Sequence, residues 1–390
     1  MADGGDDRRG AIVAAASGLF ARRGFAAVGI DDIGAAVGIS GPAIYRHFAG
    51  KDGVFEAVVR STLERLDSDI GSADAVTSPP GEAVAHVVDA ALASADGLAA
   101  LLREPERLAL PLGERDSADA PAFVQRLFDA VTQRHPALDT VSTAIRVRAL
   151  FAPLTSVVLR PAAVSPRRQR ELFLAGATAV LETPGASIPA PIATPTWKPA
   201  GTRRDDILRA ALTLFRARGY HGVGVQEIAE AAGMSAATMY HYYESKSDIL
   251  VDAYDRVDHR VVAGALDALD GARSATDALA RLAQSYTRLA IDNVDLTLVT
   301  SREASALPAD DRPRRSRGFR LTVDAWLTSL REVHPELPEA ELGLLVNSAM
   351  MLIQHGAQLS ESNPLRTDEI AALAVAQAMC PTGTRPVADD

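Results

Sequence analysis

The chain has 390 residues, of which 47% are hydrophobic and 23% are charged, with a formal net charge of −10 and a single cysteine, Cys380. This length is too great for one ordinary hydrophobic core, and a composition rich in alanine and leucine favours an all-α protein of two or more domains. One cysteine excludes an internal disulfide and no apolar run could span a membrane, so we expect a cytoplasmic protein without a secretory signal or a membrane partner.

Three short helices are predicted at the start of the chain. The first is indicated by apolar residues at helical spacing, namely Ile12, Ala16, Leu19 and Phe20, and ends near residues 23–24. A second helix is expected after Gly29. Gly38 then provides a tight turn, and Ser40 is a favourable N-cap for a third helix with Pro42 in its first turn. This order predicts a helix-turn-helix.

The third helix has an unusual outward face. A helical wheel turns Ile44 and Phe48 inward. The outward arc holds Pro42, Ala43, Tyr45, Arg46 and His47. Tyrosine, arginine and histidine are uncommon on a merely solvated face, which usually carries lysine and carboxylates. A helix of this width fits the major groove of DNA, where its first turns can reach base edges.

A proline-rich stretch, TPGASIPAPIATPTWKPAGT, occupies residues 183–202. Its prolines prevent a continuous helix and favour extended geometry of about 3.1 Å per residue, so its reach is on the order of 50–60 Å. It is predicted to be a linker, either a semi-rigid tether or a flexible spacer.

Residues 203–254 repeat residues 8–59 without a gap, at an offset of 195 and with roughly 17 identities in 52 positions. A fainter match places residues 322–337 over residues 123–138. The chain is therefore predicted to contain two copies of a unit slightly shorter than 200 residues. In the second copy Met239 and Tyr243 turn inward. The outward arc holds Ala237, Thr238, Tyr240, His241 and Tyr242.

Both copies resemble the DNA-binding head of the TetR family of transcriptional regulators. The matching stretches are LFARRGF, DDIGAAVGIS, AIYRHF and GKDGVF in the first copy, and LFRARGY, QEIAEAAGMS, TMYHYY and SKSDIL in the second. Two complete copies in one chain are similar to the less common tandem arrangement of this family. Both depart from the family at the N-cap of the second helix, where Gly29 and Gly224 replace a hydroxyl residue, so weaker backbone anchoring is expected.

The resemblance implies a DNA-binding role for each matching residue. Backbone phosphate would be bound by Tyr45, Tyr240, Lys51 and Lys246. The sugar-phosphate edge would lie against His47 and Tyr242. The bases would face Pro42, Ala43, Arg46, Ala237, Thr238 and His241, after the N-caps Ser40 and Ser235. Phosphate contacts fix the register, whereas variable positions read the sequence. Packing of Tyr45 and ordinary surface charge at the lysines are the alternatives.

The same resemblance implies the domain organisation and an effector. The expected parts are heads at 1–60 and 203–256, helical bodies at 61–182 and 257–380, the linker, and a polar tail at 381–390. By analogy with the family, residues 142–160 and 167–182 would pack on 342–359 and 367–379, which gives a monomeric intramolecular pseudo-dimer. Candidate residues for binding a small hydrophobic effector are Trp326, Asn347, Met351, Gln354 and His355, with core packing as the alternative.

The leading hypothesis is a repressor that reads an asymmetric DNA operator, because the two heads differ at every base-facing position. Residues 8–60 hold seven Lys or Arg and four Asp or Glu, whereas residues 203–250 hold six of each. The alternative is therefore a single-head DNA binder whose second head is a structural or partner-interaction module. No metal-ligand spacing, phosphate-binding glycine loop or G-x-S-x-G motif is present, so neither an enzyme nor a cofactor is expected.

Overall fold

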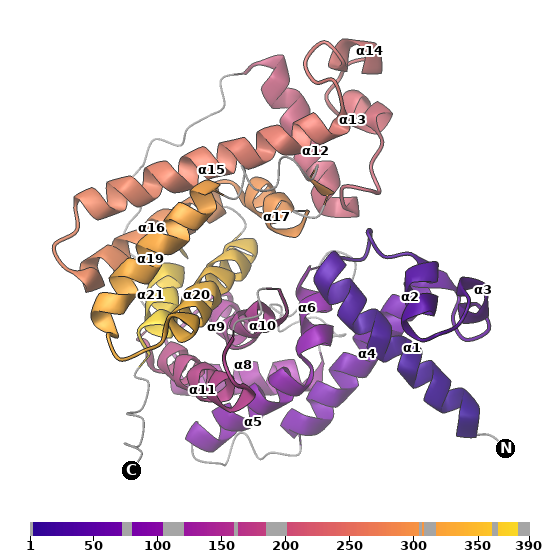
Figure 1. Cartoon of the computed structure of the whole chain (residues 1–390). Helices are drawn as coiled ribbons and strands as arrows, with labels where there is room; N and C mark the ends of the chain where they lie inside the picture. Colours follow the sequence, from indigo (N-terminus) through magenta and orange to yellow (C-terminus); the bar gives the residue numbers. More distant parts are fainter. Residues whose placement is uncertain are drawn as a thin grey trace.

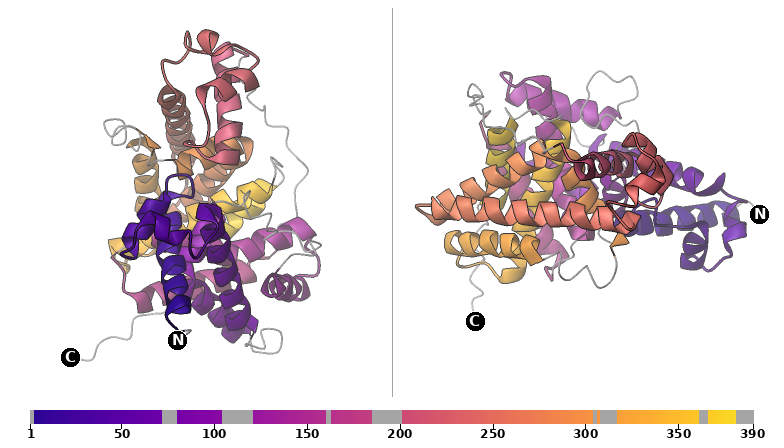
Figure 2. Two further views of the ribbon diagram at one scale, coloured as in Figure 1. Left: turned by 90° about the vertical axis from the view of Figure 1, so that its right-hand side faces the viewer. Right: turned by 90° about the horizontal axis from the view of Figure 1, so that it is seen from above.

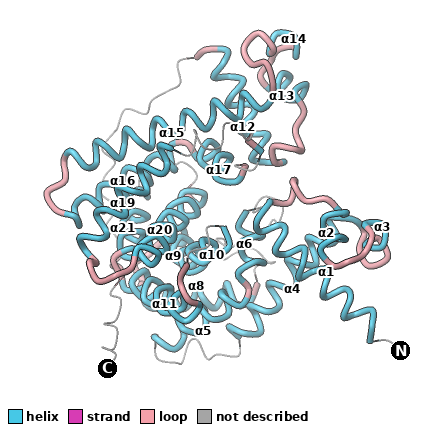
Figure 3. The backbone as a smooth tube through the Cα atoms, in the orientation of Figure 1, coloured by secondary structure: helices cyan, strands magenta, loops and turns pink. Residues whose placement is uncertain are grey.

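The computed structural model describes residues 3–71, 80–103, 121–159, 163–184, 201–303, 306–307, 317–360 and 366–380. Every regular element in these residues is a helix, as Figure 3 shows, and the all-α prediction is confirmed. Most of the expected linker, residues 185–200, and the whole expected tail, residues 381–390, lie outside the described residues.

Two units follow each other along the chain (Figure 1). The first contains α1 (Asp3–Arg23), α2 (Ile30–Ala36), α3 (Gly41–Ile44), α4 (Gly50–Gly71), α5 (Pro80–Ala93), α6 (Ala95–Arg103), α8 (Ala122–Arg134), α9 (Thr140–Phe151), η1 (Ala152–Leu154), α10 (Thr155–Leu159) and α11 (Pro166–Glu182). The second contains α12 (Arg203–Arg218), α13 (Val225–Ala231), α14 (Ala236–Met239), α15 (Lys246–Asp270), α16 (Ala275–Asp292), α17 (Val294–Arg302), α19 (Arg317–Val333), α20 (Glu339–Leu359) and α21 (Thr367–Ala378).

Each unit begins with the predicted helix-turn-helix head. The first helices end at Arg23 and Arg218, where the sequence predicts. The turn that precedes α3 and α14 passes through Gly38 and Gly233, with φ of 70° and 69°. Only glycine adopts this conformation without steric cost, which explains its presence at this position in both copies.

Aromatic rings close the core of the first head. Phe20, Phe25 and Phe55 lie with ring centroids 5.1–5.5 Å apart, so the loop after α1 is fixed against α1 and α4. In the second head Phe215 and Tyr220 pack at 5.3 Å. Aromatic pairs in this range add to the free energy of burial, by about 0.5–1.5 kcal/mol each.

The two bodies share one hydrophobic core, which includes Phe128 and Leu150 of the first unit and Trp326 and Ile353 of the second. α11 packs along α21, and α9, η1 and α10 pack along α20. One helix is expected over residues 142–160, but the described residues up to 159 are divided into α9, η1 and α10 around Pro153, because proline removes a helical hydrogen bond. Both heads lie toward the same side of the molecule, which faces the viewer in the left panel of Figure 2.

The connection between head and body is a continuous helix in each unit. The expected head boundaries at residues 60 and 256 fall inside α4 and α15. A helix is a stiff connector, so a change in the tilt of α4 or α15 in the body would move the head in which that helix starts.

Residues Thr140–Val158 form a helical stretch that is long and apolar enough to cross a membrane by length and composition alone. However, 83% of this stretch is buried inside the protein. Its apolar character is explained by the shared core of the two bodies.

Candidate nucleic-acid interface

The outward arcs of α3 and α14, with the turn that follows each helix, form the candidate interface. The predicted inward residues are confirmed: Ile44, Phe48, Met239 and Tyr243 are all buried. Their burial turns Tyr45 and Tyr240 to solvent, with 62% and 51% of their surface exposed. This exposure is what the predicted phosphate contact requires, and the contact itself stays a prediction.

The predicted DNA-binding residues are either exposed or half-buried in both heads. The exposed members are Ser40, Pro42, Tyr45, Arg46, Ser235, Ala237, Thr238, Tyr240, His241 and Tyr242. The half-buried members are Ala43, His47, Lys51 and Lys246. Ser235 caps α14 by accepting a hydrogen bond from the Thr238 backbone N–H, whereas the Ser40 side chain makes no capping bond.

The two lysines contact the loop after the first helix of their own head. Lys51 Nζ donates to the Phe25 carbonyl at 3.0 Å and lies 4.2 Å from the centre of the Phe25 ring. Lys246 Nζ donates to the carbonyls of Tyr220 and Val223, both at 2.8 Å. Burial lowers the pKa of Lys246, and Glu303 opposes this effect. These contacts give both lysines a structural role, while their phosphate contact stays a prediction.

An arginine of the first helix of each head supports the end of the recognition segment, by which we mean α3 or α14 together with the turn that follows it. Arg9 Nη1 donates to the His47 carbonyl at 2.5 Å, and its guanidinium lies 4.2 Å from the Phe48 ring centre. Arg204 repeats this contact with the Tyr242 carbonyl, at 3.1 Å, and with the Tyr243 ring. The sequence analysis did not predict this role, although both members of the pair are equivalent in the two copies: Arg9 corresponds to Arg204, and Phe48 corresponds to Tyr243.

The second helix of each head is held by an acidic residue in its first turn. Asp32 accepts from the Gly29 N–H at 2.8 Å and lies 3.1 Å from Arg23. The Gly29 backbone hydrogen bond and Arg23 lower the pKa of Asp32. Glu227 makes the equivalent contact with the Gly224 N–H at 2.8 Å. The glycine N-caps therefore supply no hydroxyl, but the helix is capped by the carboxylate.

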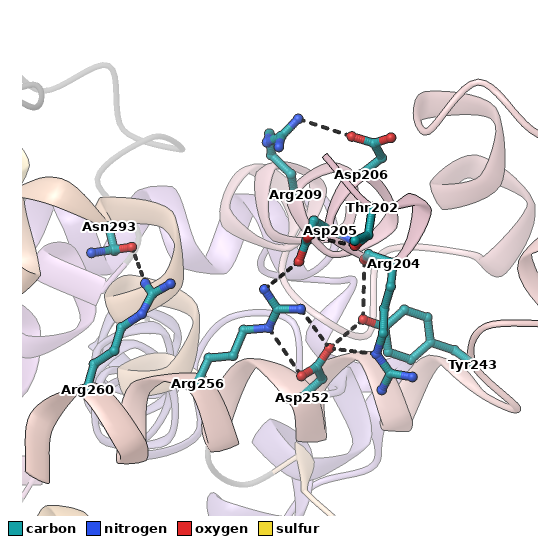
Figure 4. Close-up of polar contacts among 10 residues, drawn as sticks. All are labelled: Thr202, Arg204, Asp205, Asp206, Arg209, Tyr243, Asp252, Arg256, Arg260 and Asn293. Carbon is teal, nitrogen blue, oxygen red and sulfur yellow. Dashed lines mark hydrogen bonds and ion pairs between the residues drawn. The ribbon is translucent and has the colours of Figure 1, made fainter. Parts of the chain in front are cut away.

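The second head has a polar network that the first lacks (Figure 4). Arg256 of α15 contacts Asp205 of α12 at 2.7 Å and Asp252 at 3.2 Å. Asp252 also accepts from the Tyr243 hydroxyl at 2.5 Å and from Arg204 at 3.2 Å. Burial opposes ionisation of Asp252, but the hydrogen bonds from Tyr243 and Arg256 hold its pKa below the usual value.

The first head has small or apolar residues where the second has this network. The residues equivalent to Asp205, Tyr243, Asp252 and Arg256 are Gly10, Phe48, Ala57 and Ser61. The second head thus has charge-assisted hydrogen bonds between α12 and α15, which the residues at the equivalent positions of the first head cannot form.

Two cavities lie at equivalent head–body junctions. One, of about 540 Å³, is lined by residues that include Asp205, Leu208, Arg256, Arg260 and Asp292. The other, of about 700 Å³, lies between α1, α4 and α6. Arg260 Nη1 donates to Asn293 Oδ1 at the edge of the first cavity, as Figure 4 shows. Burial raises the pKa of Asp292.

None of the predicted effector-binding residues lines either of these two cavities. Trp326, Met351 and His355 are buried, whereas Asn347 and Gln354 are half-buried. Gln354 Nε2 donates to the Tyr286 hydroxyl at 2.7 Å, which joins α20 to α16. Trp326 Nε1 is buried without a hydrogen-bond partner. Their effector role stays a prediction. Within the described ranges, no group of three or more His, Cys, Asp or Glu could hold a metal ion.

Residues 12–58 and 207–253 each match the model of a family described as bacterial regulatory proteins, tetR family. The transcriptional activator FasR of Mycolicibacterium smegmatis is 34% identical over 85 residues, which cover 22% of this chain and 39% of FasR. The regulator EthR of the same organism is 37% identical over 78 residues, which cover 20% of this chain and 35% of EthR. The chain therefore spans less than two fifths of the length of these curated relatives.

A solved structure of a bacterial regulatory protein in the tetR family, from Rhodococcus RHA1, is also similar. Its sequence is 21% identical, and the TM-score is 0.39. The match covers 46% of this chain and 97% of that one.

Proposed function

We propose that this chain is a cytoplasmic transcriptional repressor of the TetR family whose two heads bind one DNA duplex, because both heads match the family's model. The observation that carries this proposal is the pair of outward arcs centred on Tyr45 and Tyr240. Each tyrosine would donate to a backbone phosphate and fix the register of its head. The whole chain would then contact two segments of the same operator.

The operator is proposed to be asymmetric. Arg46 of the first head corresponds to His241 of the second, and Pro42 corresponds to Ala237. An exposed arginine can pair with the O6 and N7 atoms of guanine, which distinguishes bases by about 1–3 kcal/mol. A histidine at that position presents a different donor pattern, so the two half-sites would differ in sequence.

The two units are proposed to replace the two subunits of a homodimer. The packing of α11 on α21 and the single core through both bodies support this arrangement. A covalent connection also raises the effective concentration of one unit for the other to about the millimolar range. The protein would therefore act as one chain, whose mass in solution is that of a monomer.

A small effector is proposed to control DNA binding through the bodies. The apolar composition of the bodies supports a hydrophobic ligand, with Trp326 and His355 among the residues proposed to bind it. Since α15 runs unbroken from body to head, a ligand that shifts this helix would change the spacing of the two recognition segments. Such a change would release the operator.

A second candidate is a regulator that reads DNA with the first head alone. It is favoured by the equal numbers of acidic and basic residues at 203–250. Tyr45→Phe and Tyr240→Phe separate the two functions, because each removes one hydroxyl at an exposed site. If both heads bind DNA, each variant should bind a selected duplex about fivefold more weakly at fixed salt. A loss confined to Tyr45→Phe would favour the single-head function.

A further inference from the structure

The helices that join the two units occur as equivalent pairs. α9 and α20 begin at Thr140 and Glu339, which gives the offset of 199 that also relates the preceding His-Pro turns. α11 and α21 begin at Pro166 and Thr367, which gives an offset of 201. In a symmetric pair, each contact between two residues would occur a second time between their equivalents. The contacts between the units can therefore be compared position by position.

Gly176 of α11 faces Gln377 of α21, and the offset of 201 makes them equivalent positions. A Cβ atom on Gly176 would lie 1.9 Å from Gln377 Nε2, so the glutamine amide occupies the space that a larger side chain would need. Gln377 is buried. Two copies of the first unit would leave glycine opposite glycine, with a void between them. Two copies of the second would force two glutamines into one buried space.

The charged side chains between the two units also differ at equivalent positions. Arg168 of α11 contacts Glu341 of α20 at 3.0 Å. The equivalent contact joins Glu369 of α21 to the Ser142 hydroxyl of α9, at 2.9 Å. All four side chains are largely buried. Two copies of the second unit would bring Glu341 against Glu369, whereas two copies of the first would bring Arg168 against a serine.

Arg366 of the second unit adds ion pairs to the Glu369–Ser142 contact, and the first unit has no equivalent arginine. Arg366 lies 2.6 Å from Asp139 and 3.2 Å from Glu369. Its equivalent in the first unit is Ser165, and the equivalent of Asp139 is Pro338. A pair of identical units would therefore lose the Arg366–Asp139 ion pair in both possible combinations.

We propose that each unit's interface face is complementary to the other unit of the same fold and not to a second copy of itself. The partner that this surface fits is the opposite half of the chain. Two features favour this partner: the sizes of Gly176 and Gln377 are complementary, and so are the charges of Arg168 and Glu341. This inference rests on the pairing of units in the proposed function and adds that the pairing is specific to unlike halves.

The test exchanges residues between equivalent positions in the full-length chain. Gly176→Gln, Gln377→Gly and the double exchange are compared by urea unfolding and by light scattering. We expect Gly176→Gln to raise the unfolding equilibrium constant at least tenfold, and the double variant to recover most of the lost stability. Arg168→Glu, Glu341→Arg and their double variant form a second cycle, which remains readable if Gly176→Gln does not fold. Arg167→Glu, at an 88% exposed neighbouring side chain, is the matched control.

Positive coupling in either cycle, with one chain per particle in the wild type, supports the proposal. Additive effects in both cycles, or a wild-type protein that forms stable two-chain particles, would overturn it. DNA affinity is not a readout of this experiment. A chain that shows the coupling but binds no duplex would therefore contradict the proposed function and leave the specificity of the interface intact.

Discussion

Arg256 Nη1 lies 2.7 Å from Asp205 Oδ1, and this ion pair joins α15 to α12 in the second unit. Both side chains are mostly buried, and Arg256 also holds Asp252. The equivalent residues of the first unit, Ser61 and Gly10, cannot form such a pair. The ion pairs of Arg256 therefore hold α12 against α15 in the second head, and the equivalent residues of the first head provide no such ion pair.

Replacing Arg256 with Met should destabilise the second head. Asp205 and Asp252 would keep their burial but lose their shared cation, at a cost of about 1–3 kcal/mol. Urea unfolding measures the loss, and hydrogen exchange should locate it in α12 and the start of α15. Arg209→Met, which removes an exposed contact with Asp206, should change stability by less than about 0.5 kcal/mol. Equal effects of the two substitutions would show that the network does not fix the head.

Replacing Arg9 or Arg204 with Met should weaken DNA binding without changing its dependence on salt. Each arginine holds a backbone carbonyl at the end of the recognition segment and stacks on an aromatic ring. Loss of this support should lower affinity for a selected duplex by about fivefold to tenfold. The salt slope should stay constant, because no phosphate contact is removed. Arg203→Met is the control, since that side chain is 63% exposed.

Lys51→Met and Lys246→Met separate a structural role from phosphate binding. Both ammonium groups donate to backbone carbonyls within their head, so each substitution should lower the free energy of unfolding by about 1–3 kcal/mol. Affinity titrations over a range of salt concentrations give the second readout. A slope that falls by about one for each lysine, with unchanged stability, would instead identify a phosphate contact.

The free energy of unfolding should decrease as the pH falls, because His355 is buried in its neutral form. Burial lowers the pKa of His355 well below 6.5, and Arg148 and Arg302 act in the same direction. The histidine is therefore neutral when folded and gains a proton on unfolding once the pH drops below about 6.5. Its contribution is complete above this pH and falls below it, by at most about 1.4 kcal/mol per pH unit.

The comparison that isolates His355 is His355→Gln against His86→Gln, an exposed control. Unfolding is measured from about pH 7.5 to about pH 5.5, which is above the range where most carboxylates titrate. The wild type and His86→Gln should lose stability more steeply than His355→Gln. Parallel curves for all three proteins would show that this imidazole is not kept neutral by the fold.

The heads could be predicted from the sequence because local rules determine them. Helical spacing identified the inward residues Ile44 and Met239, and a glycine turn with a serine N-cap placed the recognition segment. Contacts between distant residues were not predictable in this way. Arg256 and Asp205 are ordinary helix charges until the fold brings α12 to α15, and Lys51 turns inward to a carbonyl 26 residues earlier. A comparison of the two copies at positions 10, 57 and 61 could have revealed the unequal network.

Selection of bound sequences from a random double-stranded DNA pool tests the central claim, which is that two unlike heads read one duplex. The account predicts an enriched site with two different half-sites, separated by about one helical turn or a multiple of it. Tyr45→Phe should weaken selection at one half-site, and Tyr240→Phe at the other. Enrichment of a strict palindrome, of a single half-site, or of no duplex at all would contradict the account.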